Sequence, residues 1–314
     1  MIYTVTCNPS IDYRLELNRL VPGATNRAKS AQMQVGGKGL NVSLVLHSLG
    51  VETVAMGFVA GFVGSEIAHR MGRKSCHCRF VHLNEGCSRI NVKLGGRAES
   101  TELNAPGPEI PLEALAEMEQ YFMDFKQRDY MVLAGSVPPS LPPDIYAKWM
   151  KMLLDRGGSF VVDAVGETLL QTLPYHPFLI KPNHHELGDL FGVVVDSVGM
   201  AGGYGKKLQK MGARNVLISM SGDGAVFCGE NGRVYFQPAA KGVVKNDVGA
   251  GDSMIAGFLT GWLKTRSYVQ ALRWGTAAGA ASAFSETLAE AEEIEAILAT
   301  LPKWQRVSSK SLHT

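Results

Sequence analysis

Short runs of mainly apolar residues, many of them β-branched, recur along this chain and alternate with stretches of helical pattern. The runs occupy residues 2–6, 53–58, 130–134, 159–163, 178–181 and 215–220. Strands that read as nearly continuous apolar runs, without strict alternation, are typical of a parallel sheet covered by helices on both faces. From residue 251 to about 300 the pattern is mostly helical. The sequence therefore predicts an α/β fold of three layers with a mainly parallel central sheet.

Two segments do not follow this alternation. Residues 13–35 are polar with alternating apolar positions, and residues 89–104 resemble a hairpin that turns at Gly95-Gly96. Together they predict a small separate sheet. We therefore expect a core made of residues 1–12, 36–86 and 105–301 and a β-lid made of residues 13–35 and 87–104. The basic, polar residues 302–314 are expected to form a flexible tail.

The composition and net charge of the chain disfavour some classes of binding partner. Apolar residues make up 46% of the 314 residues and charged residues 19%, which is enough for a sizeable core. The net charge of +2 gives no reason to expect nucleic acid or a membrane surface as a partner. The start lacks the pattern of a signal peptide, and no apolar run approaches the roughly 20 residues of a membrane span. Five irregularly spaced cysteines favour reduced thiols, so we expect a cytoplasmic protein.

The motif most indicative of chemistry is a glycine-rich run directly before an apolar helix, Asn246-Asp247-Val248-Gly249-Ala250-Gly251-Asp252-Ser253. Glycines let the backbone approach a ligand, and amides at a helix start attract phosphate oxygens. A carboxylate at that start can accept the proton of an attacking hydroxyl. Equally, Asp252 can be a simple N-cap. The local pattern does not separate these two interpretations.

A second glycine-rich helix start, at residues 36–41, carries Lys38 and Asn41. A cation and an amide at such a start suit polyol hydroxyls or an anionic substituent, whereas the alternative is a tight turn with a solvated lysine. The frame of a Walker A motif is absent because Leu40 follows Gly39. Gly249-x-Gly251 lacks the third glycine of the dinucleotide fingerprint, which disfavours a nicotinamide-dependent dehydrogenase.

Two further loops follow predicted strands. Asn183 and Glu186 lie three residues apart and can hold Mg²⁺ through water, but the same spacing is that of a helix capping box, which is favoured when the motif is taken alone. Residues 219–224 are small and polar, and they suit either a nucleotide contact or a hairpin turn.

Taken together and in this order, the motifs resemble the ribokinase-like sugar kinases, in their phosphofructokinase B branch. The resemblance extends from residue 6 to about residue 298. Its most specific stretches are residues 36–43, 88–94, 133–138, 181–187 and 248–258. It implies ATP-dependent phosphorylation of a ketose phosphate. The expected reaction converts fructose 1-phosphate to fructose 1,6-bisphosphate, with tagatose 6-phosphate as the alternative substrate; Ile90-Asn91-Val92-Lys93 after Arg89 favours fructose.

The resemblance also implies roles for individual residues. The catalytic base would be Asp252, with the amides of Gly249, Ala250 and Gly251 as the anion hole. Sugar hydroxyls would be bound by Asp12, Gly37, Lys38 and Asn41. The phosphate already on the substrate would be held by Arg27, Arg89 and Ser136. ATP and Mg²⁺ would be bound by Lys181, Asn183, Glu186, Ser219, Gly222 and Gly224.

The β-lid would pair two subunits into a homodimer. One departure from the family pattern is Asp247, which stands where serine or threonine is usual and would add negative charge near the triphosphate. A non-catalytic sugar-phosphate sensor of the same fold is the remaining hypothesis, and the intact Gly249, Gly251 and Asp252 argue against it.

Overall fold

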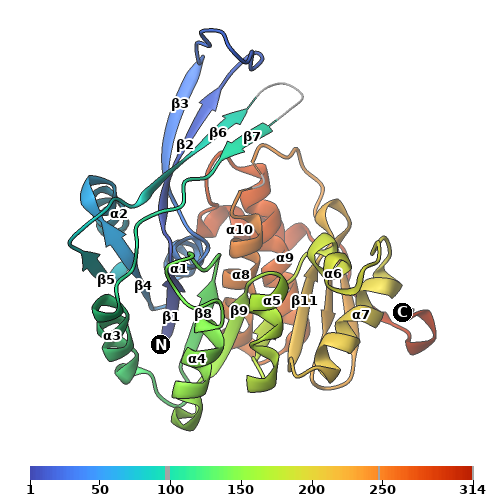
Figure 1. Cartoon of the computed structure of the whole chain (residues 1–314). Coiled ribbons are helices and arrows are strands. Elements are labelled where there is room, and N and C mark those ends of the chain that lie inside the picture. Colours follow the sequence, from blue (N-terminus) through green and yellow to red (C-terminus); the bar gives the residue numbers. More distant parts are fainter. Residues whose placement is uncertain (96–99, 247, 313–314) are drawn as a thin grey trace.

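The computed structural model describes residues 1–95, 100–246 and 248–312, which form a large and a small β-sheet (Figure 1). The large sheet has ten strands. From edge to edge they are β14 (Gln305–Val307), β13 (Val234–Pro238), β12 (Gly224–Cys228), β11 (Asn215–Ser219), β10 (Leu179–Ile180), β9 (Ser159–Asp163), β8 (Tyr130–Ala134), β1 (Ile2–Thr6), β4 (Thr53–Ala60) and β5 (His77–Leu83).

The strands from β11 to β5 are parallel, whereas β12, β13 and β14 pair antiparallel at one edge. The predicted mainly parallel sheet is therefore confirmed, and β1, β8 and β9 have the predicted bounds. β10 is shorter than predicted. Pro177 and Pro182 flank it, and proline has no N–H to donate to a ladder.

Helices cover both faces of the large sheet (Figure 1). One face carries α3 (Leu112–Tyr121), α4 (Ile145–Leu153), α5 (Gly166–Leu170), α6 (His184–Phe191) and α7 (Val198–Lys210). The other face carries α1 (Lys38–Ser48), α2 (Gly61–Arg73), α8 (Ala250–Thr265), α9 (Tyr268–Phe284) and α10 (Ala291–Thr300). Each face has its own apolar core, with Trp149 fully buried in the first and Phe258 in the second. This is the predicted three-layer α/β fold.

The small sheet is the β-lid, which projects from the large unit (Figure 1). Its strands, in spatial order, are β3 (Ser30–Gly36), β2 (Ser10–Glu16), β6 (Arg89–Gly95) and β7 (Ser100–Leu103). β6 and β7 pair antiparallel, as the predicted hairpin requires, although its connection at 96–99 lies outside the described residues. The sheet already begins at Ser10, so Asp12 belongs to the lid sheet rather than to the preceding core segment.

The C-terminal segment differs from its expectation. Within the predicted flexible tail, residues 305–307 pair with residues 234–236 as an edge strand. Val307 and Leu312 pack against the apolar core of the α3 to α7 face. Three paired residues are too few to produce a readable strand pattern, which is why the sequence did not indicate β14.

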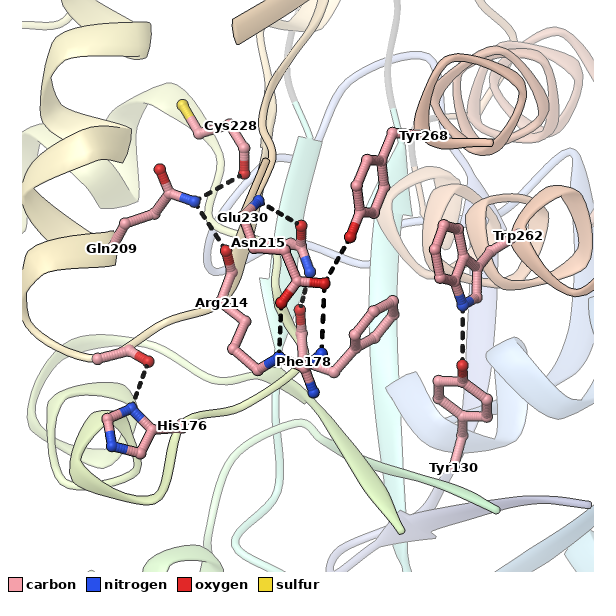
Figure 2. A network of polar contacts seen from close by, with 11 residues as sticks. Tyr130, His176, Phe178, Gln209, Arg214, Asn215, Cys228, Glu230, Trp262 and Tyr268 are labelled. Atoms are coloured by element: carbon pink, nitrogen blue, oxygen red, sulfur yellow. Dashed lines mark hydrogen bonds and ion pairs between the residues drawn. The ribbon is translucent and has the colours of Figure 1, made fainter. Parts of the chain in front are cut away.

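A polar network ties β10, β11 and β12 together at the amino ends of the parallel strands (Figure 2). Asn215 Nδ2 donates to the Phe178 carbonyl at 2.8 Å, while Asn215 Oδ1 accepts from Glu230 N at 3.0 Å. Arg214 and Tyr268 both donate to the Glu230 carboxylate, at 2.8 and 2.5 Å. The network holds the antiparallel strands to the parallel part of the sheet. It lies at the amino ends of the parallel strands, so their carboxyl ends remain free for a site.

Among the described helices, none combines the length and apolarity that crossing a bilayer requires.

Candidate active site

A cleft of about 1170 Å³ lies between the carboxyl ends of the parallel strands and the inner face of the β-lid. Open α/β sheets place their ligands at this end because loops and helix starts converge there. Apart from Arg27, the predicted site residues all line the cleft. They are Asp12, Gly37, Lys38, Asn41, Arg89, Ser136, Lys181, Asn183, Glu186, Ser219, Gly222, Gly224, Gly249, Ala250, Gly251 and Asp252.

One predicted site residue is not part of the cleft, and one predicted feature cannot be located within the described residues. Arg27 is exposed in the connection between β2 and β3 and is not part of the cleft wall, so its contact with the substrate phosphate stays a prediction. Asp247, expected to add charge near the triphosphate, lies outside the described residues.

The start of α8 supplies backbone donors to the cleft. Gly249 is the N-cap residue with φ 79°, in the left-handed region that favours glycine. The Ser253 N–H donates to the Gly249 carbonyl at 2.8 Å, so the amides ahead of it precede the first helical hydrogen bond. Ala250 and Gly251 line the cleft at this point. Amides of this kind at a helix start attract a phosphate oxygen.

Asp252 does not cap the helix. The α8 start has no side-chain cap, and the Asp252 Oδ2 atom instead accepts a hydrogen bond of 2.8 Å from Asn41 Nδ2 on α1. The interpretation of Asp252 as a simple N-cap is therefore wrong. A carboxylate on the cleft wall, 6% exposed and held from a second helix, has the placement of a proton acceptor.

The surroundings of Asp252 change its acidity. Burial and, secondly, the negative charge of Asp163 raise the pKa of Asp252 to about 6, against the opposing effects of Asn41, Lys38 and Lys181. The carboxyl is thus mostly ionised at neutral pH yet is a stronger base than an exposed aspartate. A proton acceptor is most effective when its pKa lies close to the working pH.

Asp163, at the end of β9, joins two cations of the cleft. Its Oδ1 atom lies 3.2 Å from Lys38 Nζ and 3.5 Å from Lys181 Nζ. Burial by itself would raise the pKa of Asp163, but the two ammonium groups outweigh it and hold the pKa below its usual range. The same carboxylate therefore fixes one lysine from the predicted sugar side and one from the predicted nucleotide side.

The β-lid supplies the sugar end of the cleft. Asp12 on β2 pairs with Lys93 Nζ at 2.9 Å and accepts hydrogen bonds from Ser10 Oγ at 2.7 Å and Asn91 Nδ2 at 3.1 Å. Arg89, on the same strand as Asn91 and Lys93, donates from Nε to the Asn8 carbonyl at 3.1 Å. This end thus presents hydrogen-bonding groups and cations, as a sugar carrying an anionic group requires.

At the nucleotide end, Asn183 and Glu186 form the predicted capping box and also have the position that the alternative, Mg²⁺ binding through water, would require. The Asn183 side chain accepts from Glu186 N and the Glu186 side chain accepts from Asn183 N, each at 2.8 Å, so the capping box is present. Both side chains nevertheless line the cleft. Residues 221–223 form the turn between β11 and the antiparallel β12, so the predicted hairpin turn is also correct while Ser219 and Gly222 face the cleft.

These residues fit a nucleotide with a divalent cation. The buried Asp163 Oδ2 atom has no hydrogen-bond partner among the described residues, and Glu186 places a second carboxylate on the same cleft. Mg²⁺ in nucleotide sites takes one or two carboxylates and keeps several waters. A Cβ on Gly251 would lie 3.1 Å from Lys181 Nζ, so glycine leaves room for an anion between that ammonium and the helix start.

Comparison with known proteins identifies this arrangement. The pattern of the pfkB family carbohydrate kinases matches residues 6–294. The 1-phosphofructokinase of Bacillus subtilis is 43% identical over 298 residues, which cover 95% of this chain and 97% of that protein. This chain belongs to the pfkB family of carbohydrate kinases. The D-tagatose-1-phosphate kinase of Bacillus licheniformis, also similar, is 34% identical over 94% of this chain and 96% of its own length.

A solved structure supports the same assignment to the pfkB family. A Staphylococcus aureus protein assigned as a phosphofructokinase has a TM-score of 0.84 and 38% identity, over 98% of this chain and 99% of its own. The predicted ribokinase-like fold, the phosphofructokinase B branch and the class of sugar-phosphate kinase are confirmed. The roles of single residues in this pfkB protein stay predictions.

Three residues of this pfkB site had no role predicted from the sequence, namely Asp163, Asn91 and Lys93, although the last two belong to the stretch that favours fructose. Asp163 directly follows three apolar residues of β9, and a carboxylate at the carboxyl end of a buried parallel strand is a usable signal. Asn91 and Lys93 alternate with Arg89 along β6 and so share its face. Strand periodicity could therefore have placed them at the cleft once Arg89 was assigned to it.

Proposed function

We propose that this pfkB protein transfers the γ-phosphoryl group of ATP to a ketose phosphate, with fructose 1-phosphate as its substrate and fructose 1,6-bisphosphate as the product. The observation that carries the proposal is the position of Asp252. Its buried carboxylate lies on the cleft wall in the first turn of α8, beside backbone amides suited to an anion. The polar inner face of the β-lid lines the same cleft.

The residues of the chain divide the reaction between them. Asp252 takes the proton of the attacking hydroxyl as the new bond to phosphorus forms. The amides of Gly249, Ala250 and Gly251 hold the charge that develops on the transferred group. Lys38 and Lys181, both fixed by Asp163, direct positive charge to the same region. Mg²⁺, when bound near Asn183 and Glu186, would neutralise triphosphate charge.

Names of relatives support a ketose 1-phosphate. The 43% identical relative is named for fructose 1-phosphate and the 34% identical relative for tagatose 1-phosphate, which makes tagatose 1-phosphate a second candidate. These two sugars differ in configuration at one ring carbon. Tagatose 6-phosphate, the alternative from the sequence, also offers a free hydroxymethyl group opposite its phosphate.

The test is an assay of ADP release with fructose 1-phosphate, tagatose 1-phosphate and tagatose 6-phosphate as acceptors. The proposal expects the highest kcat/KM for fructose 1-phosphate, together with a requirement for Mg²⁺. A higher value for either tagatose phosphate would reassign the substrate. Binding of all three sugars without ADP release would instead support the non-catalytic sensor.

We also propose that the β-lid pairs two copies of the chain. Strand alternation directs Ser10, Asp12 and Asn91 to the cleft and places apolar residues on the opposite lid face. On that face Met33 is 47%, Ile90 38% and Leu103 55% exposed. A small sheet with an uncovered apolar face is marginal alone, and a second lid would cover it.

The compartment is proposed from the thiols. Cys7, Cys76, Cys78, Cys87 and Cys228 are all free. Free thiols are typical of the reducing cytoplasm, where ATP and sugar phosphates are available. We therefore propose that the kinase acts there.

A further inference from the structure

The acceptor atoms of Asp12 are largely occupied before any sugar binds. Oδ1 accepts from Ser10 Oγ at 2.7 Å and from Asn91 Nδ2 at 3.1 Å, and Oδ2 pairs with Lys93 Nζ at 2.9 Å. A carboxylate offers about four acceptor sites, so about one is left. Accepting hydrogen bonds from two adjacent sugar hydroxyls requires two sites. One of the three protein donors must therefore leave when Asp12 binds a diol.

Ser10 and Asn91 are unsuited to leave. Their side chains are 1% and 5% exposed, and Asn91 Nδ2 also donates to Ser10 Oγ at 3.1 Å, so the two are locked together. Both come from strands paired in register at this point, with Asp12 opposite Asn91. The short side chains have few alternative rotamers that would reach another partner.

Lys93 can leave. Its ammonium stands at the end of a flexible four-carbon stem, and the side chain lines the cleft at 13% exposure. A second carboxylate, Glu102, lies 3.9 Å from Nζ and is itself 46% exposed, so the lysine is not confined to Asp12. The charge that it would leave uncompensated on Asp12 faces an entering phosphate dianion. The repulsion between them is relieved if the departing ammonium binds that phosphate.

We propose that Lys93 is a specificity-determining, substrate-binding residue: it pairs with Asp12 in the free kinase and moves to the phosphate of the bound ketose phosphate, which frees Asp12 for the sugar hydroxyls. The inference rests on the proposed function for the class of substrate. It adds a second cation of β6 to the phosphate contact expected from Arg89. The same exchange would favour binding of phosphorylated over unphosphorylated sugars, because only a phosphate attracts Lys93 away from Asp12.

The first experiment is calorimetric titration of fructose 1-phosphate into Lys93→Met, Lys93→Gln and Lys93→Arg. Loss of a charge-assisted hydrogen bond should weaken binding by roughly 10- to 100-fold in the Met and Gln variants. The Arg variant should retain most of the affinity. If Lys93→Gln binds as well as wild type, a neutral donor suffices, and the phosphate contact is overturned. Melting temperature and ATP affinity, expected unchanged, show that each variant is folded.

The matched control is Lys148→Met. Lys148 forms an ion pair with Asp144 at the same 2.9 Å, on α4 and away from the cleft. Exposed pairs of this kind contribute little, so sugar affinity should stay within about twofold of wild type.

The second experiment repeats Lys93→Met in an Asp12→Asn background. If Lys93 contacts the phosphate, its removal still weakens binding by roughly 10- to 100-fold when Asp12 carries no charge. If Lys93 only neutralises Asp12, its removal has no further effect there, and the proposal is overturned. Binding is measured without turnover, so the result is independent of the proposed function, whose failure would appear as absent ADP release.

Discussion

Asn41 Nδ2 donates a hydrogen bond of 2.8 Å to Asp252 Oδ2 across 211 residues of sequence. The bond joins the first turn of α1, at one glycine-rich motif, to the first turn of α8, at the other. Asn41 thereby orients one oxygen of the proposed base. Since α1 and α8 pack on the same face of the sheet, the two motifs are fixed relative to each other by the core beneath them.

Asp252→Asn is expected to lower turnover by roughly 10²- to 10⁴-fold, because the variant keeps size and hydrogen bonding but loses the proton acceptor. Steady-state turnover measured beside melting temperature and ATP binding tests this, with the last two expected to stay close to wild type. Retention of more than about a tenth of wild-type turnover would show that the proton goes to another acceptor.

The raised pKa of Asp252 predicts an acid limb in the pH profile. Because the carboxyl must be ionised to accept a proton, kcat/KM should decline as the pH falls through about 6. Asp163→Asn removes one of the causes that raise this pKa, so the surviving activity should show its acid limb at lower pH. The measurement is the pH dependence of kcat/KM for wild type and for Asp163→Asn, with the coupling enzymes in excess. An unshifted midpoint would mean that Asp252 is not the group titrating.

Arg89→Ala is expected to raise the KM for the sugar phosphate by roughly 10- to 100-fold, the effect of a lost charge-assisted hydrogen bond. In the free protein the guanidinium lines the cleft and bonds only to the Asn8 carbonyl among the described contacts, and burial lowers its pKa. The KM for ATP should stay nearly constant. Equal changes in the KM values for ATP and for the sugar phosphate would contradict the assignment of Arg89 to the sugar phosphate.

Glu186→Gln separates capping from metal binding. Glutamine can still accept from the Asn183 N–H, so the capping box and the melting temperature should be kept. If Glu186 holds Mg²⁺ through water, loss of the charge should raise the Mg²⁺ concentration for half-maximal rate by roughly 10- to 100-fold. A magnesium titration at saturating ATP and sugar checks this. An unchanged titration would leave Glu186 with capping alone.

The lid dimer predicts a particle of twice the chain mass in light scattering at micromolar concentration. Leu103→Glu places a charge on the apolar lid face and should give monomers. Leu112→Glu is the matched control, because Leu112 is 78% exposed on α3, outside the lid, and its substitution should leave the dimer intact. A monomeric wild-type protein would contradict lid pairing.

Much of the fold follows from local sequence. β1, β8 and β9 could be bounded because burial on both faces favours apolar and β-branched residues along the strand, and that preference is readable within five residues. The lid hairpin was equally readable from its period of two. β14 could not be recognised from the sequence, because it forms by pairing with β13 and by packing on a core built from other segments.

The sequence by itself determined the layers of the fold, the two glycine-rich helix starts and most of the residues that meet at the cleft. It could not decide between base and cap for Asp252, because both need the same residue at the same helix start. Tertiary structure excluded the cap, because Asp252 is buried and bonds to Asn41 instead, while the role of base stays a proposal. It also decided that Asp163 joins Lys38 to Lys181 and that Lys93 pairs with Asp12. Turns and caps depend on neighbours along the chain, whereas desolvation and charge pairing depend on what the folded core brings together.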